Sequence, residues 1–226
     1  MRVAVIGRGK AGSAVITGLG CEQIHDIYHS TNLVTVDKLQ GADVVIVFVP
    51  GMHFATILPI LIKANIPVVC GVTGFDWPER WQQRLIQPWI CAHNFSLAMY
   101  FVRQCLGILG KIDKVVSEST FALTETHHAD KVDAPSGTAL HWRDWLGQDC
   151  EITAKRTGDV KGFHQLAIDL PFETITLSHN SKNRQLFAQG AIWAARYLQT
   201  HDLPKGSYGF HDILSRAIES KDPANE

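Results

Sequence analysis

A glycine-rich hexapeptide near the start of the chain constrains the fold more than any other feature. It consists of Gly7, Arg8, Gly9, Lys10, Ala11 and Gly12, which fit the pattern G-x-G-x-x-G. The hexapeptide follows a β-branched run at positions 2–6 and opens a helical stretch at about 12–19. In this setting the first glycine permits a tight turn, the second lets a pyrophosphate approach the backbone, and the third allows close helix–strand packing. The pattern predicts a dinucleotide-binding loop, and the alternative is a tight turn without a ligand.

Alternating strand and helix signals continue after this loop. Continuous apolar runs at 43–49 and 66–72 are typical of strands that are buried on both faces of a parallel sheet, and the segment 53–65 between them looks helical despite its proline. The alternation predicts a Rossmann-like, doubly wound parallel α/β domain.

The pattern of apolar and polar residues changes after about position 94. Four stretches alternate in polarity or carry β-branched residues, at 120–128, 150–158, 163–171 and 172–180. A helix is expected near 139–146, a long helix at 186–199, and the segment 207–214 closes the chain. This pattern predicts a second, mixed α/β domain with a more antiparallel sheet.

Composition excludes several classes of protein. The 226 residues are 46% hydrophobic and carry a formal net charge of −1, without the basic excess of a nucleic-acid-binding surface. The N-terminal apolar run is too short for a signal peptide, and the most apolar stretch, 44–62, is interrupted by two prolines, so we expect no membrane span. The five cysteines are odd in number and scattered, which favours reduced, mostly buried thiols over disulfides or a zinc site. We therefore expect a soluble cytoplasmic protein.

The residue that reads the cofactor ribose is expected about 20 residues after the glycine loop. The second strand is placed at 24–29, with Asp26 inside it and an acid-free tip at His29, Ser30, Thr31 and Asn32. Because a carboxylate would repel a 2′-phosphate, this tip favours NADP, but a solvated loop explains it equally well. The preference between NADH and NADPH stays open.

Two further turns follow predicted strands. Gly71, Val72, Thr73 and Gly74 come after one of them, and Ala92, His93, Asn94, Phe95 and Ser96 come after another. Ligands bind at the carboxyl ends of strands in open α/β sheets. These segments are therefore either cofactor contacts or ordinary connecting turns.

Two adjacent histidines and a lysine precede a turn of small residues at 133–138. His127, His128 and Lys131 can supply a titratable proton and a fixed positive charge. Ser136 or Gly137 lies where a helix N-cap is expected, so the N–H groups of Gly137 and Thr138 and the Thr138 hydroxyl can hold an anion. The cluster predicts an anionic-substrate site with a proton donor. We expect no metal, since adjacent histidines on a strand point to opposite faces and no cysteine is near. The other alternative is that these are polar surface residues without a function.

The sequence resembles one known family over nearly its whole length. The carrying motif is E-T-H-H-A-D-K-V-D-A-P-S-G-T-A-L at 125–140. It is supported by G-V-T-G-F-D at 71–76, A-H-N-F-S at 92–96, R-T-G-D-V-K-G-F-H at 156–164, L-S-H-N-S-K-N-R-Q-L-F-A-Q-G-A at 177–191 and G-S-Y-G-F-H-D-I-L at 206–214. These motifs resemble the 4-hydroxy-tetrahydrodipicolinate (dihydrodipicolinate) reductase family.

The resemblance implies a function and a division into domains. It implies NADPH- or NADH-dependent reduction of 4-hydroxy-tetrahydrodipicolinate to tetrahydrodipicolinate, in the biosynthesis of diaminopimelate and lysine. Residues 1–96, completed by 187–226, would bind the cofactor. Residues 97–186 would bind the dicarboxylate substrate and build a homotetramer.

The resemblance also implies roles for individual residues. His127 carries over as proton donor and acceptor, Lys131 as proton donor, and His128, Gly137 and Thr138 as contacts of the substrate carboxylates; we place Ser136 with them. The cofactor contacts would be residues 7–12 together with Gly71, Val72, Thr73, Ala92, His93, Asn94 and Phe95.

Departures from the family pattern bear on cofactor preference and rate more than on reaction type. The glycine loop has K-A-G where the family commonly has R-M-G, Ala129 replaces a usual arginine, and Ala98 replaces a usual glycine. Three alternatives remain at this stage: another imine or amino-acid dehydrogenase on the same fold, a non-catalytic nucleotide sensor, and a zinc hydrolase.

Overall fold

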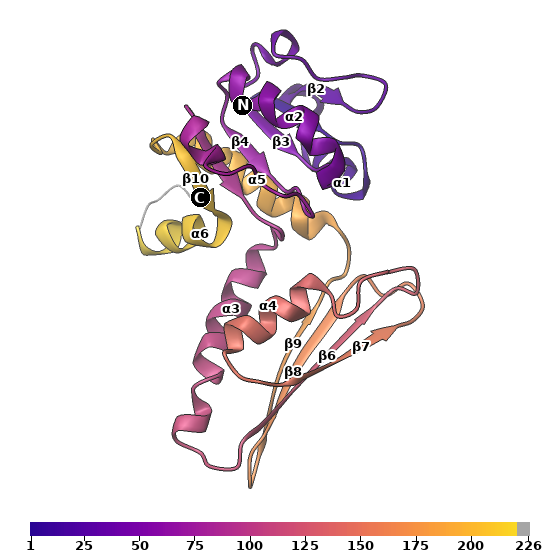
Figure 1. Ribbon diagram of the computed structural model, residues 1–226, viewed down its shortest axis with the longest axis vertical. Helices are drawn as coiled ribbons and strands as arrows, with labels where there is room; N and C mark the ends of the chain where they lie inside the picture. Colours follow the sequence, from indigo (N-terminus) through magenta and orange to yellow (C-terminus); the bar gives the residue numbers. More distant parts are fainter. Residues whose placement is uncertain (221–226) are drawn as a thin grey trace. The chain divides into compact units, whose positions relative to one another are not determined.

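The chain folds into two units, each with its own sheet (Figure 1). This computed structural model describes residues 1–220. The first unit comprises Met1–Leu97 and the segment from Gln185 onward, and the second comprises Ala98–Arg184.

A fully parallel six-stranded sheet forms the centre of the first unit. Its strand order is β10-β5-β4-β3-β1-β2. The strands are β1 (Val3–Ile6), β2 (Ile24–Tyr28), β3 (Val44–Val47), β4 (Val68–Cys70), β5 (Pro88–Cys91) and β10 (Gly206–Gly209). The order reverses direction between β1 and β3, and the crevice at such a switch point is where open α/β sheets bind ligands.

Helices cover both faces of this sheet. They are α1 (Lys10–Gly18), α2 (Gly51–Ala64), α5 (Gln185–Thr200) and α6 (Phe210–Glu219). Helix α2 packs Phe54, Leu58 and Leu61 into one core with the strands, whereas α5 lies against α1, β3 and β4. The predicted Rossmann-like class is confirmed, because the strands are apolar on both sides and need a helical layer on each.

The second unit has a mixed sheet in the order β7-β6-β8-β9. Its elements are β6 (Thr120–His127), β7 (Glu151–Arg156), β8 (Phe163–Asp169), β9 (Thr174–Asn180), α3 (Leu97–Leu109) and α4 (Gly137–Leu146). Strands β6 and β7 are parallel and the other pairs are antiparallel. Helix α4 connects β6 to β7, as a parallel pair requires, and buries Trp142 against Leu123 and Leu166.

Three features differ from expectation or had no prediction. Helix α3 and strand β10 were not predicted, and four short 3₁₀ turns connect other elements, at Cys21–Gln23, Asp37–Leu39, Trp81–Arg84 and Ile112–Lys114. All five cysteines are free thiols, as expected; Cys70 and Cys150 are buried and Cys91 is half-buried, whereas Cys21 and Cys105 are exposed. Within residues 1–220, none of the helices combines the length and apolar character needed to cross a membrane.

Candidate active site

The glycine loop connects β1 to α1 in a conformation that only glycine allows. Gly7 has φ of +106°, and a Cβ there would overlap the carbonyl oxygen of Phe48. A Cβ on Gly12 would overlap the carbonyl oxygen of Gly7. Both glycines are therefore required by close backbone packing, as predicted from the motif.

The first turn of α1 is open to a ligand. The helix begins at Lys10, and its N-cap, Gly9, supplies no side-chain hydrogen bond to the free N–H groups. A Cβ on Gly9 would meet nothing within 4 Å, so this glycine is not needed for packing. Free N–H groups behind an open surface suit a phosphate, and the residues present fit a dinucleotide.

A cavity of about 660 Å³ lies at the switch point of the parallel sheet. The residues after three strands line it: Gly7, Arg8 and Gly9 after β1, His29 and Ser30 after β2, and Phe48, Val49 and Pro50 after β3. Helix α2 adds His53, Thr56, Ile57 and Ile60, which sequence reasoning missed because their helical periodicity does not tell which face lines a pocket. Among residues 1–220, no carboxylate lines this cavity, and the Asp26 carboxylate accepts a hydrogen bond from Ile27 N at 2.7 Å instead.

The two other predicted cofactor segments lie along the same edge of the sheet. Cys70 and Cys91 lie opposite each other in the register of β4 and β5, each as the last residue of its strand. Gly71 and Ala92, which follow them, therefore lie at the same level of the sheet. The side chains of Val72 and Phe95 are buried, which leaves their backbone groups for contact. These segments, with Lys10, Ala11 and Gly12, do not line the cavity itself.

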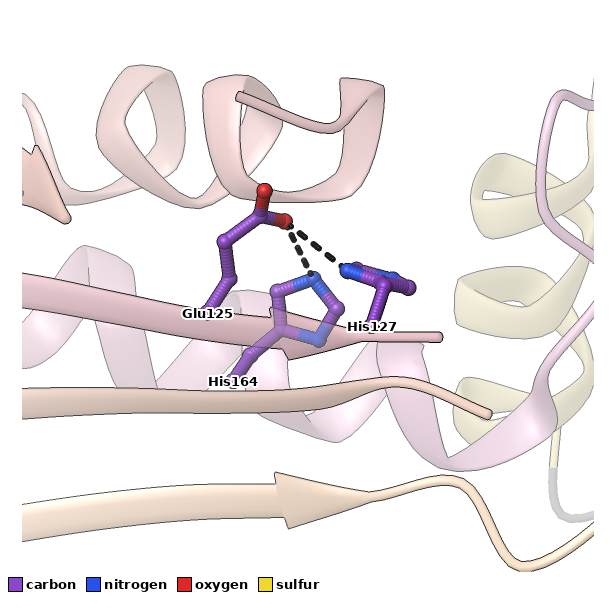
Figure 2. A group of neighbouring side chains, drawn as sticks. All are labelled: Glu125, His127 and His164. Carbon is purple, nitrogen blue, oxygen red and sulfur yellow. Dashed lines mark ion pairs between the residues drawn. The ribbon is translucent and has the colours of Figure 1, made fainter. Parts of the chain in front are cut away.

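In the second unit, His127 lies at the end of β6 in a cluster of buried polar side chains (Figure 2). Its Nδ1 is 3.3 Å from Oε2 of Glu125, which lies two residues earlier and therefore on the same face of the strand. His164 of β8 is directly opposite Glu125 in the sheet, with its Nε2 at 3.5 Å from the same oxygen. Figure 2 shows both imidazoles turned toward the carboxylate.

The Glu125 carboxylate is held from two further elements. Ser136, the N-cap of α4, donates its N–H to Oε1 at 2.9 Å and its hydroxyl to Oε2, and its Oγ accepts from Ala139 N. Arg156, at the end of β7, donates from Nη2 to Oε1 at 2.8 Å. Three donors and an arginine charge therefore balance a carboxylate that is fully buried.

These contacts set the charges of the cluster. Burial opposes ionisation of Glu125, but the hydrogen bonds from Ser136 and Arg156 outweigh it and lower the pKa of Glu125. Burial lowers the pKa of His127, against the upward effect of Glu125. For His164, burial and the neighbouring His127 lower the pKa to about 4. At neutral pH the cluster thus holds one carboxylate, one guanidinium and neutral imidazoles.

The other residues of the predicted substrate site are accessible. Lys131 pairs with Asp133 at 2.6 Å, Gly137 is exposed, and His128 and Thr138 are partly exposed. Ser136 differs: it is buried, and its side chain serves Glu125 and the start of α4. We therefore no longer assign Ser136 as a substrate contact.

Glu125, His127 and His164 also offer three potential metal-ligand atoms within 4.8 Å of one another. A metal would have to displace the Ser136 and Arg156 donors from the carboxylate. The guanidinium already supplies the positive charge that this carboxylate requires. The arrangement suits an internal hydrogen-bond network better than a cation site.

Comparison with known proteins identifies the family. Residues 97–214 match the model for the C-terminal region of dihydrodipicolinate reductase. Across 94% of the chain and 98% of the relative, the sequence is 30% identical to 4-hydroxy-tetrahydrodipicolinate reductase of Haloarcula marismortui. The chain belongs to the dihydrodipicolinate reductase family. The predicted family and the NAD(P)H-dependent oxidoreductase class are confirmed.

Solved structures support the fold of this reductase. A dihydrodipicolinate reductase from Paenisporosarcina sp. TG-14, solved with dipicolinate bound, superposes with a TM-score of 0.71 at 16% identity, over 94% of this chain and 99% of that one. An amine dehydrogenase from Mycobacterium smegmatis gives a TM-score of 0.61 at 10% identity, over 93% and 95%. Both likenesses concern the fold alone.

Sequence reasoning missed three members of the cluster in this reductase. Glu125 stood inside the carrying motif without a role, and Arg156 and His164 stood at the two ends of the supporting motif at 156–164, also without one. Only the register of β6 with β7 and β8 brings them together. The one available signal was a glutamate two residues before His127, on the same face of a predicted strand.

Proposed function

We propose that this reductase converts 4-hydroxy-tetrahydrodipicolinate to tetrahydrodipicolinate, with His127 as the residue that exchanges the proton. The observation that carries the assignment is a buried imidazole, held beside an ionised carboxylate and next to an accessible lysine and helix N-terminus. Bound NADPH or NADH supplies the hydride. The dipicolinate named in the related Paenisporosarcina structure is a planar dicarboxylate, which supports a substrate of that class.

The residues of the second unit would divide the remaining work. Loss of a hydroxyl as water places a proton on the leaving oxygen and releases one from the adjacent ring carbon. Hydride addition to the conjugated imine then requires one proton at the ring, which His127 and Lys131 would provide. The substrate carboxylates would be held by His128 and by the N–H groups of Gly137 and Thr138, where α4 begins.

The first unit would bind the cofactor through residues 7–12, 71–73 and 92–95. We propose that NADPH is accepted at least as well as NADH, because Arg8, His29 and Ser30 line the cavity and no carboxylate from the described part of the chain does. The five free thiols fit a cytoplasmic protein. We also keep the homotetramer, built through the second unit, as a proposal that light scattering tests.

The assay follows NAD(P)H absorbance with enzymatically generated 4-hydroxy-tetrahydrodipicolinate. His127→Gln should lower kcat by about 10²- to 10⁴-fold, because it removes a positioned acid–base group. Nucleotide affinity should not change, since His127 belongs to the other unit. His201→Gln, directly after α5, serves as the matched control. Wild-type kcat in His127→Gln would refute the assignment of the proton to His127, and no turnover by the wild type would refute the function.

A further inference from the structure

Glu125 is a buried carboxylate for which the reaction described above has no role. It is fully buried and lies on the same face of β6 as His127, with Oε2 at 3.3 Å from Nδ1 of that ring (Figure 2). Nδ1 is itself buried and has no hydrogen-bond partner within residues 1–220. Oε2 of Glu125 is thus the acceptor within reach of Nδ1. Catalytic hydrogen bonds are often long without substrate and tighten when it binds.

The carboxylate is rigidly placed for this contact. Ser136 donates to both of its oxygens and Arg156 donates to Oε1, so the side chain is fixed from α4 and from β7. Arg156 is itself anchored, because it also donates to the carbonyl oxygens of Lys155 and Asp133. A carboxylate held in this way orients a partner without moving, which is the requirement for positioning an imidazole.

The opposite nitrogen of the His127 ring faces a residue without a side chain. A Cβ on Gly162 would lie 3.2 Å from Nε2 and 3.5 Å from Oγ of Ser181. Gly162 has φ of +157°, and its carbonyl oxygen accepts a hydrogen bond from Ser181 N at 2.8 Å. The ring therefore has the Glu125 carboxylate beside Nδ1, and Gly162 beside Nε2.

We propose that Glu125 is a positioning residue that accepts the Nδ1–H of His127 and so fixes the tautomer in which Nε2 exchanges the proton with substrate. This inference rests on the proposed function. Nε2 of the neutral ring first takes a proton from water, which gives the imidazolium. In the step, this Nε2–H bond breaks and the proton bonds to the reduced ring of the substrate. The imidazole that remains keeps its Nδ1–H on Glu125, which stays ionised throughout.

His164 supports this arrangement without replacing Glu125. Its Nε2 is 3.3 Å from Oγ of Ser136 and 3.5 Å from Oε2, and its pKa of about 4 keeps it neutral. A neutral His164 does not consume the negative charge of Glu125. That charge therefore remains available to an imidazolium at position 127 when a proton arrives there.

The main test compares Glu125→Gln with Glu151→Gln, an exposed control at the start of β7 in the same sheet. Glu125→Gln should lower kcat by about 10²- to 10⁴-fold with little change in KM, because an amide does not fix the required tautomer. Glu125→Asp should recover part of kcat, and Glu151→Gln should match the wild type. Wild-type kcat in Glu125→Gln would overturn the proposal. A loss of kcat that is fully explained by a smaller fraction of folded protein would overturn it too.

A pH profile gives a readout that a structural role would not move. His127 is faced by Glu125 of the same strand, Lys131 and Asp133 of the following loop, Arg156 of β7 and His164 of β8. Removing only the Glu125 charge removes an upward contribution to the pKa of His127. The limb of the profile due to the imidazolium should therefore move to lower pH in Glu125→Gln, and an unmoved limb would contradict the proposal.

Nitrogen NMR of the His127 ring decides the question without a Glu125 variant. The signals are assigned by their loss in His127→Gln, and the neutral ring should carry its proton on Nδ1. A proton on Nε2 in the wild type overturns the proposal even if Glu125→Gln does not fold. Because the spectrum needs no turnover, it also separates failure of this inference from failure of the proposed function.

Discussion

At the scale of single residues, Gly9 separates folding from ligand binding. Gly7 and Gly12 are required by the backbone that touches them, whereas a Cβ on Gly9 would enter open space. Gly9→Ala should therefore leave the free energy of unfolding within about 0.5 kcal/mol of the wild type. It should nevertheless weaken NADPH binding, because the methyl group occupies the place where a pyrophosphate approaches the backbone.

The measurement for Gly9→Ala pairs urea unfolding with fluorescence titration of NADPH. Gly107→Ala is the matched control, since Gly107 lies within α3 and a Cβ there would have its nearest contact at 3.9 Å. Unchanged NADPH affinity in Gly9→Ala would remove the glycine loop from the cofactor site.

Residues differ in how far the sequence alone reveals them. His127 and Lys131 were identified because they lie in one short motif with a turn of small residues. Arg156 and His164 come from β7 and β8, so their contact with Glu125 depends on strand register. Burial of one face of the sheet specifies the register, but the pattern within one strand does not tell which residue of a distant strand lies opposite.

At the scale of elements, the start of α4 links folding to the charged cluster. Ser136 caps the helix through Ala139 N and donates two hydrogen bonds to the buried Glu125. Ser136→Ala removes the cap and one donor to a buried carboxylate, and keeps the backbone donor. We expect a loss of about 2 kcal/mol in the free energy of unfolding.

Urea unfolding at neutral pH measures this loss. Ser117→Ala is the control, because Ser117 is exposed, and it should change stability by less than about 0.5 kcal/mol. Equal stabilities of the two variants would show that the Ser136 hydroxyl does not support the cluster.

The elements of the first unit were predicted more fully than those of the second. Buried parallel strands are continuous apolar runs bounded by turns, so β1, β3 and β4 were visible directly. Helix α3 was missed although it is amphipathic, and the parallel pairing of β6 with β7 was missed because alternation predicts a strand but not its direction.

At the scale of the whole molecule, the imidazoles that are buried or half-buried make stability depend on pH. Burial lowers the pKa values of His127, His164 and His179, and that of His164 to about 4. In the unfolded chain a histidine has a pKa of about 6.5. As the pH falls below about 6.5, the unfolded state therefore binds protons that the folded state does not bind, and the equilibrium moves toward unfolding.

His164 alone should reduce the free energy of unfolding by about 2 kcal/mol between pH 7 and pH 5, and this contribution levels off below about pH 4, where both states are protonated. In His164→Gln the loss between pH 7 and pH 5 should be smaller by about that amount. Urea unfolding of both proteins at the two pH values gives the comparison. His179→Gln should reduce the loss in the same direction, because burial also lowers the pKa of His179. If His164→Gln loses as much stability as the wild type, then His164 is not neutral in the folded protein, and the negative charge of Glu125 is shared between two imidazoles instead of being reserved for His127.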